Sequence, residues 1–138
     1  MEFFSIGQMT EIVGMNADKV KNWMAGHPFA FKPSAQAASG KGSRNIYNRN
    51  DLYLLGVANE FSKAGFAGKA IGRLLDAVRP RLATLPRTAV LTVWRVTPGG
   101  PFHLDAGTNK PAGVTLWHMF EVGALLQRID ERIDRLGR

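Results

Sequence analysis

The chain has 138 residues, carries a formal net charge of +7 at pH 7 and contains no cysteine. Its length fits one domain or two small ones, and a hydrophobic content of 45% favours a packed core over a disordered chain. The lack of cysteine excludes a disulfide framework, a thiol redox sensor and thiolate zinc sites. The opening residues do not match a signal peptide and no apolar run approaches about 20 residues, so we expect a cytoplasmic protein that does not cross a membrane.

A short amphipathic helix is predicted over residues 5–13. Ser5 and Gln8 fit a capping box, in which each side chain accepts a hydrogen bond from the other residue's backbone N–H. Gly14 suits the left-handed backbone conformation that often ends a helix. The apolar stripe at helical spacing consists of Met9, Ile12 and Val13.

A second helix is predicted over residues 16–25, after a tight turn, with Asn16 as its N-cap. The residues spaced to face inward are Val20, Trp23 and Met24. Lys19 and Asn22 are then expected on the opposite face, with Lys21 at its edge. That division gives one face to the core and leaves the other for base edges and phosphates.

A flexible basic loop follows the second helix. Residues 34–43 are mostly small and are typical of the flexible tip of a hairpin, which carries Lys41 and has Lys32 and Arg44 close by in the sequence. There is no Asp or Glu between Lys19 and Arg49. Two helices joined by a turn and followed by a basic loop indicate a surface that binds a nucleic-acid duplex.

The positive charge belongs mainly to the first part of the chain. Through Arg87 there are twelve Lys and Arg against six acids, and after it six against five. Positive charge that is concentrated in one part of a protein is a better sign of a polyanionic partner than charge that is spread evenly over its surface. The alternative is a solvated surface that is merely basic.

Two further helices complete the first part. Asn50 is expected to cap the third helix, which ends at Gly65, with Leu54, Leu55, Ala58 and Phe61 inward. The fourth begins near Phe66 and has Ile71, Leu74, Leu75 and Val78 on one face. One more turn is expected over residues 81–85, and Pro86 marks a boundary.

The remaining residues predict a small sheet and a C-terminal helix. Strands are expected over 88–96, 101–104 and 114–120, and a helix over 121–136. The helix carries a heptad-spaced seam that either packs on the sheet or pairs with a second subunit: Val122, Leu126, Ile129, Ile133 and Leu136. The predicted fold is therefore α+β, with an N-terminal winged helix-turn-helix domain (1–80) and a sheet-plus-helix segment for dimerisation or regulation (87–138).

Residues 3–78 resemble the winged helix-turn-helix domain of the MerR family. The matching motifs, in order, are Phe4-Ser5-Ile6-Gly7-Gln8, Val20-Lys21-Asn22-Trp23, Arg44 with Tyr47, Asp51-Leu52, Gly65-Phe66, Ile71 and Leu74-Leu75. The resemblance implies a transcription regulator that binds as a dimer, with its second helix in the major groove and its wing on the backbone. It also implies that Lys21 takes the place of the family's recognition-helix arginine and Arg44 that of the wing arginine.

These observations define a set of expected DNA contacts. Sequence-independent attraction to phosphates is assigned to Lys32, Lys41, Arg44 and Arg49. Readout of base edges is assigned to Lys19, Lys21 and Asn22, because Asn pairs with adenine and Lys donates to guanine. Arg49 lies at a helix start, where the helix dipole disfavours a cation unless an anion is present. Tyr47 is either a packing residue or a phosphate contact.

Other chemistry has weaker support in the sequence. His103, Asp105 and His118 are too few and too far apart to predict a metal site. Residues 40–43 lack the glycine spacing of a phosphate-binding loop, and no nucleophile lies beside a base, so we expect no enzymatic activity, metal or cofactor. Trp94 and Trp117 either line a ligand pocket or form the core of the sheet.

The sequence thus favours a sequence-specific regulator of double-stranded DNA that works as a homodimer through residues 88–138. Two alternatives remain open. One is an architectural or excisionase-like protein that bends DNA, and the other is a protein-interaction module whose helix-turn-helix no longer binds DNA. Nothing in the sequence supports a small-molecule effector.

Overall fold

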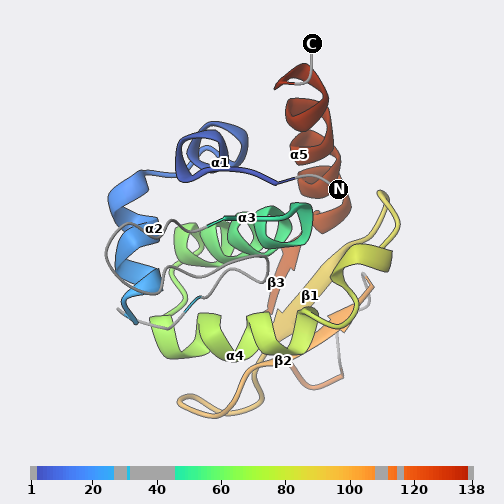
Figure 1. The fold of residues 1–138 in the computed structure, drawn as a ribbon. Coiled ribbons are helices and arrows are strands. Elements are labelled where there is room, and N and C mark those ends of the chain that lie inside the picture. The colour runs from blue at the N-terminus through green and yellow to red at the C-terminus, as the bar shows by residue number, and fades with distance from the viewer. Residues whose placement is uncertain (1–2, 27–30, 32–45, 108–111, 115–116, 137–138) are drawn as a thin grey trace.

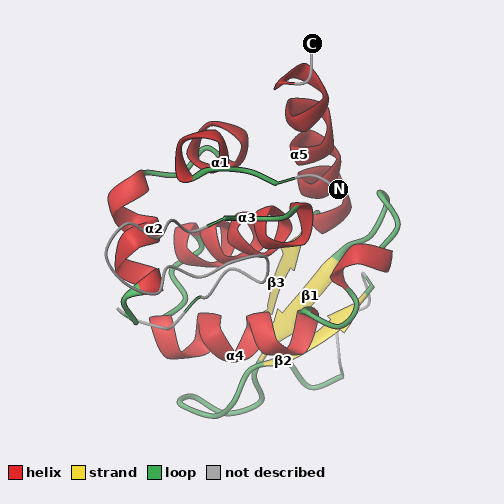
Figure 2. Ribbon diagram, viewed as in Figure 1, coloured by secondary structure: helices red, strands yellow, loops and turns green. Residues whose placement is uncertain are grey.

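The architecture was taken from a computed structural model, which describes residues 3–26, 31, 46–107, 112–114 and 117–136 (Figure 1). Along the described parts of the chain, a group of helices comes first, and a sheet and a last helix follow (Figure 2). In order they are α1 (Ile6–Val13), α2 (Ala17–Met24), α3 (Arg49–Lys63), α4 (Gly68–Val78), the 3₁₀ turn η1 (Leu82–Thr84), β1 (Leu91–Trp94), β2 (His103–Ala106), β3 (Trp117–Phe120) and α5 (Val122–Leu136). The predicted α+β class is confirmed at this level.

Local capping explains the first two helices. The Ser5 Oγ accepts from the backbone N–H of Gln8 at 3.3 Å, and Gln8 Oε1 accepts from the N–H of Ser5 at 3.0 Å. Gly14 ends α1 with φ of 77°, which a residue with a Cβ rarely adopts. Asn16 caps α2 by accepting from the N–H of Asp18 at 2.7 Å. Both helices therefore begin and end as predicted.

Helix α3 lies at the centre of the molecule and contacts α1, α4, α5 and η1 (Figure 1). The prediction that Asn50 caps it is wrong. The cap is Asn48, whose Oδ1 accepts from the N–H of Asp51 at 2.9 Å, while Asp51 Oδ2 accepts from the N–H of Asn48 at 3.0 Å. This reciprocal pair satisfies two backbone donors, which Asn50 cannot do from inside the first turn.

The three strands form an antiparallel sheet in the order β2-β1-β3. Val93 lies opposite Leu104 and His118, whereas Trp94 lies opposite His103 and Trp117. Because side chains alternate along a strand, Val93 faces the helices and Trp94 faces away from them. β1 is shorter than the strand predicted over 88–96, whereas β2 has the predicted length of four residues but starts and ends two residues later in the chain. Pro101, where the strand was predicted to start, has no N–H for a ladder.

The seam of α5 packs against α3 and α1 rather than against the sheet. Val122, Leu126, Ile129 and Ile133 are buried, and Leu136 is 39% exposed. Gly56 of α3 permits this close approach, since a Cβ there would lie 2.9 Å from Ile129 Cδ1. The seam is thus buried within one subunit, mainly against two helices. We expected it to pack on the sheet or to pair with a second subunit, and this arrangement agrees with neither expectation.

One hydrophobic core joins the two predicted segments. Its members come from α1 through α4 and also from β1 and α5, on both sides of Pro86. Gly123 brings the start of α5 onto the chain after Pro86, and its N–H donates to the carbonyl of Ala89 at 3.0 Å. None of the described helices combines the length and apolar character needed to cross a bilayer.

Candidate nucleic-acid interface

Helix α2 presents Lys21 and Asn22 to solvent. Its opposite side holds it to the core, because Val20 is fully buried and Trp23 is only 3% exposed. Lys21 and Asn22 are both exposed, next to each other in the sequence and on the outer side of the helix. Two of the three residues assigned to base readout therefore have solvent-exposed side chains.

Lys19 occupies a different position from the one predicted. Its Nζ donates to Asn59 Oδ1 of α3 at 3.0 Å and lies 5.2 Å from the centroid of the Trp23 ring. Asn59 is only 5% exposed, so its amide oxygen needs a donor inside the protein. Lys19 thus links α2 to α3. The prediction that it lies on the face opposite the core is wrong. A polar Asn59 among apolar α3 residues was the only signal for this pair.

Arg49 is the first residue of α3, so it lies at a helix start, as the sequence suggested. Its ion-pair partner is a carboxylate of the same chain. Its Nη1 donates to Asp130 Oδ1 of α5 at 2.9 Å. The same carboxylate accepts from Arg87 Nη2 at 2.7 Å and from the Tyr53 hydroxyl. The charge of Arg49 at a helix N-terminus is therefore offset within the protein, without an external phosphate.

This Arg49–Tyr53–Arg87–Asp130 network is partly buried. The Asp130 side chain is 19% exposed, and burial raises the pKa of its carboxyl. Hydrogen bonds from Tyr53, Arg87 and Arg49 outweigh burial and hold the pKa of Asp130 below its ordinary value. The ionised carboxylate is consequently the form that the folded protein favours.

Tyr47 belongs to the core. Its side chain is fully buried, and its hydroxyl donates to Met24 Sδ at 2.9 Å. Burial, together with the nearby Asp51 charge, raises the pKa of Tyr47 to about 12. The packing interpretation therefore applies, and the alternative phosphate contact is excluded in this conformation because no part of the side chain reaches solvent.

The predicted hairpin falls largely outside the described residues, and Lys32, Lys41 and Arg44 lie there. Among the described residues, Phe31 and Tyr47 lie near the ends of this segment. Phe31 is buried and its N–H donates to the carbonyl of Trp23 at 3.0 Å, and Tyr47 exchanges two backbone hydrogen bonds with Phe4. Phe31 and Tyr47, which flank it in the chain, are therefore buried beside α2 and beside Phe4.

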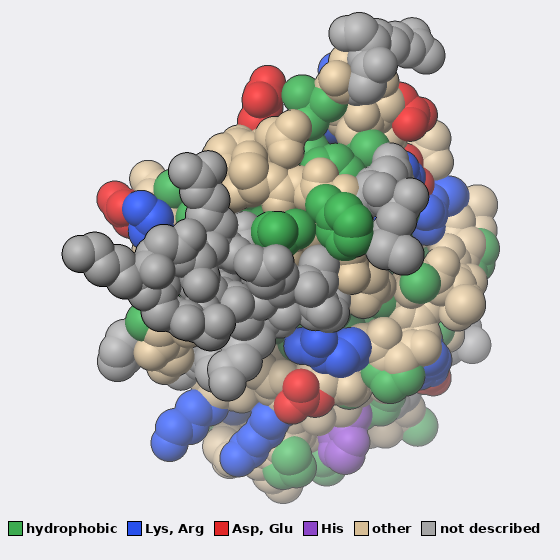
Figure 3. Space-filling model, in the orientation of Figure 1, with side chains coloured by type: hydrophobic (Ala, Val, Ile, Leu, Met, Phe, Trp, Pro, Cys, Tyr) green, Lys and Arg blue, Asp and Glu red, His purple; other side chains and the backbone are tan. Residues whose placement is uncertain are grey.

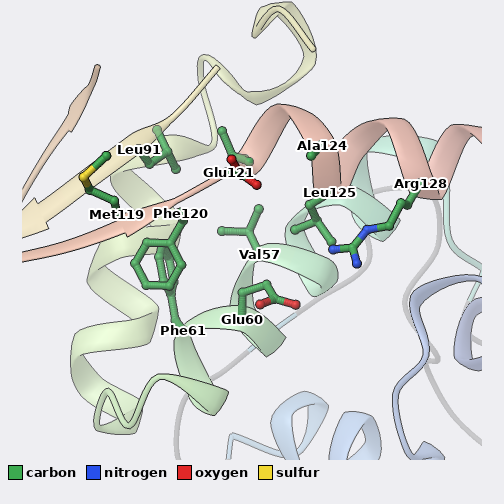
Figure 4. A pocket seen from close by; sticks show the side chains of 11 residues that line it. Val57, Glu60, Phe61, Leu91, Met119, Phe120, Glu121, Ala124, Leu125 and Arg128 are labelled. Carbon is green, nitrogen blue, oxygen red and sulfur yellow. The ribbon is translucent and has the colours of Figure 1, made fainter. Parts of the chain in front are cut away.

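An apolar pocket of about 570 Å³ lies between α3, β3 and α5 (Figure 4). Phe61 and Phe120 meet edge to face in its wall, with ring centroids 4.9 Å apart. Three charged side chains also line it: Glu60, Glu121 and Arg128. Trp94 and Trp117 do not line this pocket, because they lie on the other face of the sheet, where Trp94 stacks on His103.

The three residues considered for a metal site do not converge. His103 and Asp105 point to the outer face of the sheet, whereas His118 lies opposite Val93 and its ring is 4.8 Å from that of Phe66. Across the parts of the chain that the structure describes, no three His, Asp or Glu side chains are grouped to hold a metal ion.

Comparison of the sequence with models of protein families and with curated proteins gave no match. Evidence about function therefore comes from the residues and their geometry. The feature with the most specific chemistry is α2, where a lysine and an asparagine project from a helix that is anchored on its other side.

Proposed function

We propose that the protein is a sequence-specific, double-stranded DNA-binding regulator with an N-terminal winged helix-turn-helix. The observation that carries this proposal is the exposure of Lys21 and Asn22 on α2, opposite the buried Val20 and Trp23. A helix held this way can enter the major groove without losing its packing. The turn at Gly14 and the resemblance to the MerR family support the same arrangement.

Each exposed residue of α2 has a defined chemical role in this proposal. The Asn22 amide both donates and accepts, which matches N6 and N7 of adenine, and the Lys21 ammonium donates to O6 or N7 of guanine. Lys19 acts as a positioning residue through Asn59. The phosphate contacts come from Lys32, Lys41 and Arg44, while Arg49 and Tyr47 are left out because they have internal roles.

We further propose that the active species is a homodimer formed through residues 88–138. Because the α5 seam is buried within the subunit, the second copy would contact other surfaces of this part. Met119, which is 50% exposed, and Leu136, which is 39% exposed, are large apolar side chains there. A palindromic DNA site would reflect the two-fold symmetry of such a dimer.

Selection of binding sequences from random duplex DNA tests the proposal directly. We expect a palindromic consensus, and in titrations of that site a log–log salt slope near −5 if each subunit neutralises about three phosphates. Asn22→Ala should reduce discrimination between the consensus and mutated sites, whereas Lys41→Ala should weaken binding to all sequences alike. A slope near zero, or no enriched sequence, would contradict the proposal. Strong bending of DNA without any effect on transcription would indicate an architectural protein instead.

A further inference from the structure

A second, smaller pocket of about 280 Å³ lies between α4 and the chain that connects β1 to β2. This connection passes close to α4 along the lower edge of the molecule in Figure 1. Figure 3 shows Lys and Arg side chains projecting from the same edge. The three cations that line the pocket are Lys69 and Arg73 of α4 and Arg95, which follows β1.

None of these three cations has an acidic partner in the described part of the chain. The ion pairs found there are Arg49–Asp130, Arg87–Asp130 and Lys63–Glu60. Asp76, the acid on α4, does not line the pocket. Three like charges around one hollow repel one another, and this repulsion is relieved when an anion occupies the space between them.

Contacts in the wall of the pocket position Arg95 and the turn that follows it. The Arg95 guanidinium lies over the Phe102 ring, 5.0 Å from its centroid, which holds the cation at the rim. Gly100 closes the turn by donating its N–H to the carbonyl of Thr97 at 2.9 Å. A Cβ on Gly100 would lie 2.5 Å from Thr97 Oγ1 and 3.1 Å from the Thr97 carbonyl oxygen, so the turn leaves little room for a larger residue.

The remaining lining is apolar and small. Ala70 and Leu74 of α4 face Leu104 of β2 across the hollow. The volume is below the range of about 300–1,000 Å³ that is typical of sites for drug-sized ligands. The pocket therefore accommodates a compact anionic group together with only part of the molecule that carries it.

We infer that this pocket binds the phosphate group of a small organic molecule. A phosphate presents several acceptor oxygens to the three exposed cations that line the pocket, and each guanidinium can contact it with two parallel N–H donors. The site is separate from the proposed reading surface on α2 and does not depend on it. The same chemistry is present in a DNA backbone phosphate, so the experiment must distinguish the two sources.

Titrations of the full-length protein, followed by backbone amide NMR, test the inference. The probes are inorganic phosphate, adenosine monophosphate and, as the uncharged control, adenosine. We expect saturable shifts at Gly99, Gly100 and Ala70 with the two phosphates and none with adenosine. Arg73→Gln and Arg95→Gln should each weaken binding about tenfold, the effect of losing one charge-assisted contact. Arg79→Gln, which removes an exposed arginine at the end of the same helix, should leave binding unchanged.

Two results would overturn the inference. One is a phosphate response of equal size in Arg79→Gln and Arg73→Gln, which would indicate a diffuse cationic surface. The other is displacement of adenosine monophosphate from Gly99 and Gly100 by a short duplex, which would make the DNA backbone the source of the phosphate. Lys21→Ala separates this test from that of the regulator, because it should impair DNA binding and leave the adenosine monophosphate response intact.

Discussion

Arg49 and Asp130 stand 81 positions apart in the chain, yet Arg49 Nη1 donates to Asp130 Oδ1 at 2.9 Å. The contact joins the first residue of α3 to the middle of α5. Arg87, from the segment between η1 and β1, donates to the other carboxylate oxygen through Nε at 3.1 Å and Nη2 at 2.7 Å. One carboxylate therefore links three parts of the fold: α3, the segment before β1, and α5.

Asp130→Asn should destabilise the protein. The substitution removes the only carboxylate between Arg49 and Arg87 within this network and leaves two guanidinium groups near each other. We expect the free energy of unfolding to fall by about 2 kcal/mol, a value discounted for the partial exposure of both arginines. Urea denaturation measures the change, with Asp134→Asn on the exposed side of α5 as the control. Equal stability of the two variants would show that the network contributes nothing.

The contribution of Asp130 should also depend on pH in a defined direction. Its pKa is lowered in the folded state relative to the ordinary value of 3.8. The stabilisation is therefore fully present above the unfolded pKa, and it is lost as pH falls below that value through the folded pKa. We expect the difference in unfolding free energy between wild type and Asp130→Asn to be larger in neutral buffer than in acid. A difference that is independent of pH would contradict this assignment.

The two tyrosines should ionise at a higher pH in the native protein than in the unfolded chain. Burial and the Asp51 charge raise the pKa of Tyr47 to about 12, and burial with the Asp130 hydrogen bond raises that of Tyr53. An unfolded chain ionises tyrosine near pH 10. The unfolded state thus releases protons first as pH rises, and stability falls between about pH 10 and 12.

Ultraviolet absorbance of tyrosinate measures this titration. We expect little tyrosinate in the native protein near pH 10 and normal ionisation in urea. Tyr47→Phe leaves only Tyr53 and should remove the component with the highest pKa. Ionisation of Tyr47 at an ordinary pH in the folded protein would mean that its hydroxyl reaches solvent.

Gly123→Ala should be strongly destabilising. A Cβ at this position would overlap the backbone carbonyl of Arg87 and approach the N–H of Ala89 at 2.7 Å, and backbone cannot move aside as a side chain can. We expect a loss of about 2 kcal/mol or more in urea denaturation. Gly7→Ala provides the matched control. It lies in α1 with only Ser5 Oγ near the added Cβ, at 3.9 Å, and should be neutral or stabilising because alanine favours helix.

Lys19 and Lys21 should have opposite phenotypes despite their proximity. Lys19→Ala leaves the buried Asn59 oxygen without its donor, so we expect about 1–2 kcal/mol less stability in urea denaturation. Lys21→Ala removes an exposed side chain and should leave the melting temperature unchanged while weakening DNA binding. Fluorescence anisotropy with a labelled duplex measures the second effect. Unchanged stability of Lys19→Ala would disprove its bracing role.

Several local features could be predicted from the sequence because their causes lie within a few residues. The capping box joins Ser5 to Gln8, and Gly14 follows the last apolar residue of its helix, so neither depends on the rest of the fold. Apolar spacing likewise identified the inward faces of α4 and α5, because helical periodicity fixes which residues share a side. The exposure of Lys21 and Asn22 follows from the same periodicity.

Partners distant in the sequence were decided by the tertiary structure. Helical spacing placed Lys19 outward, but a flexible four-carbon side chain can fold back to a buried acceptor 40 positions away. The seam of α5 was evident from its spacing, whereas its close packing on α3 at Gly56 is visible only in the tertiary structure. Helical periodicity in the sequence determines which residues share one face of a helix. Only the packing of the folded chain determines which other element that face contacts, because burial and hydrogen-bond satisfaction depend on the whole chain.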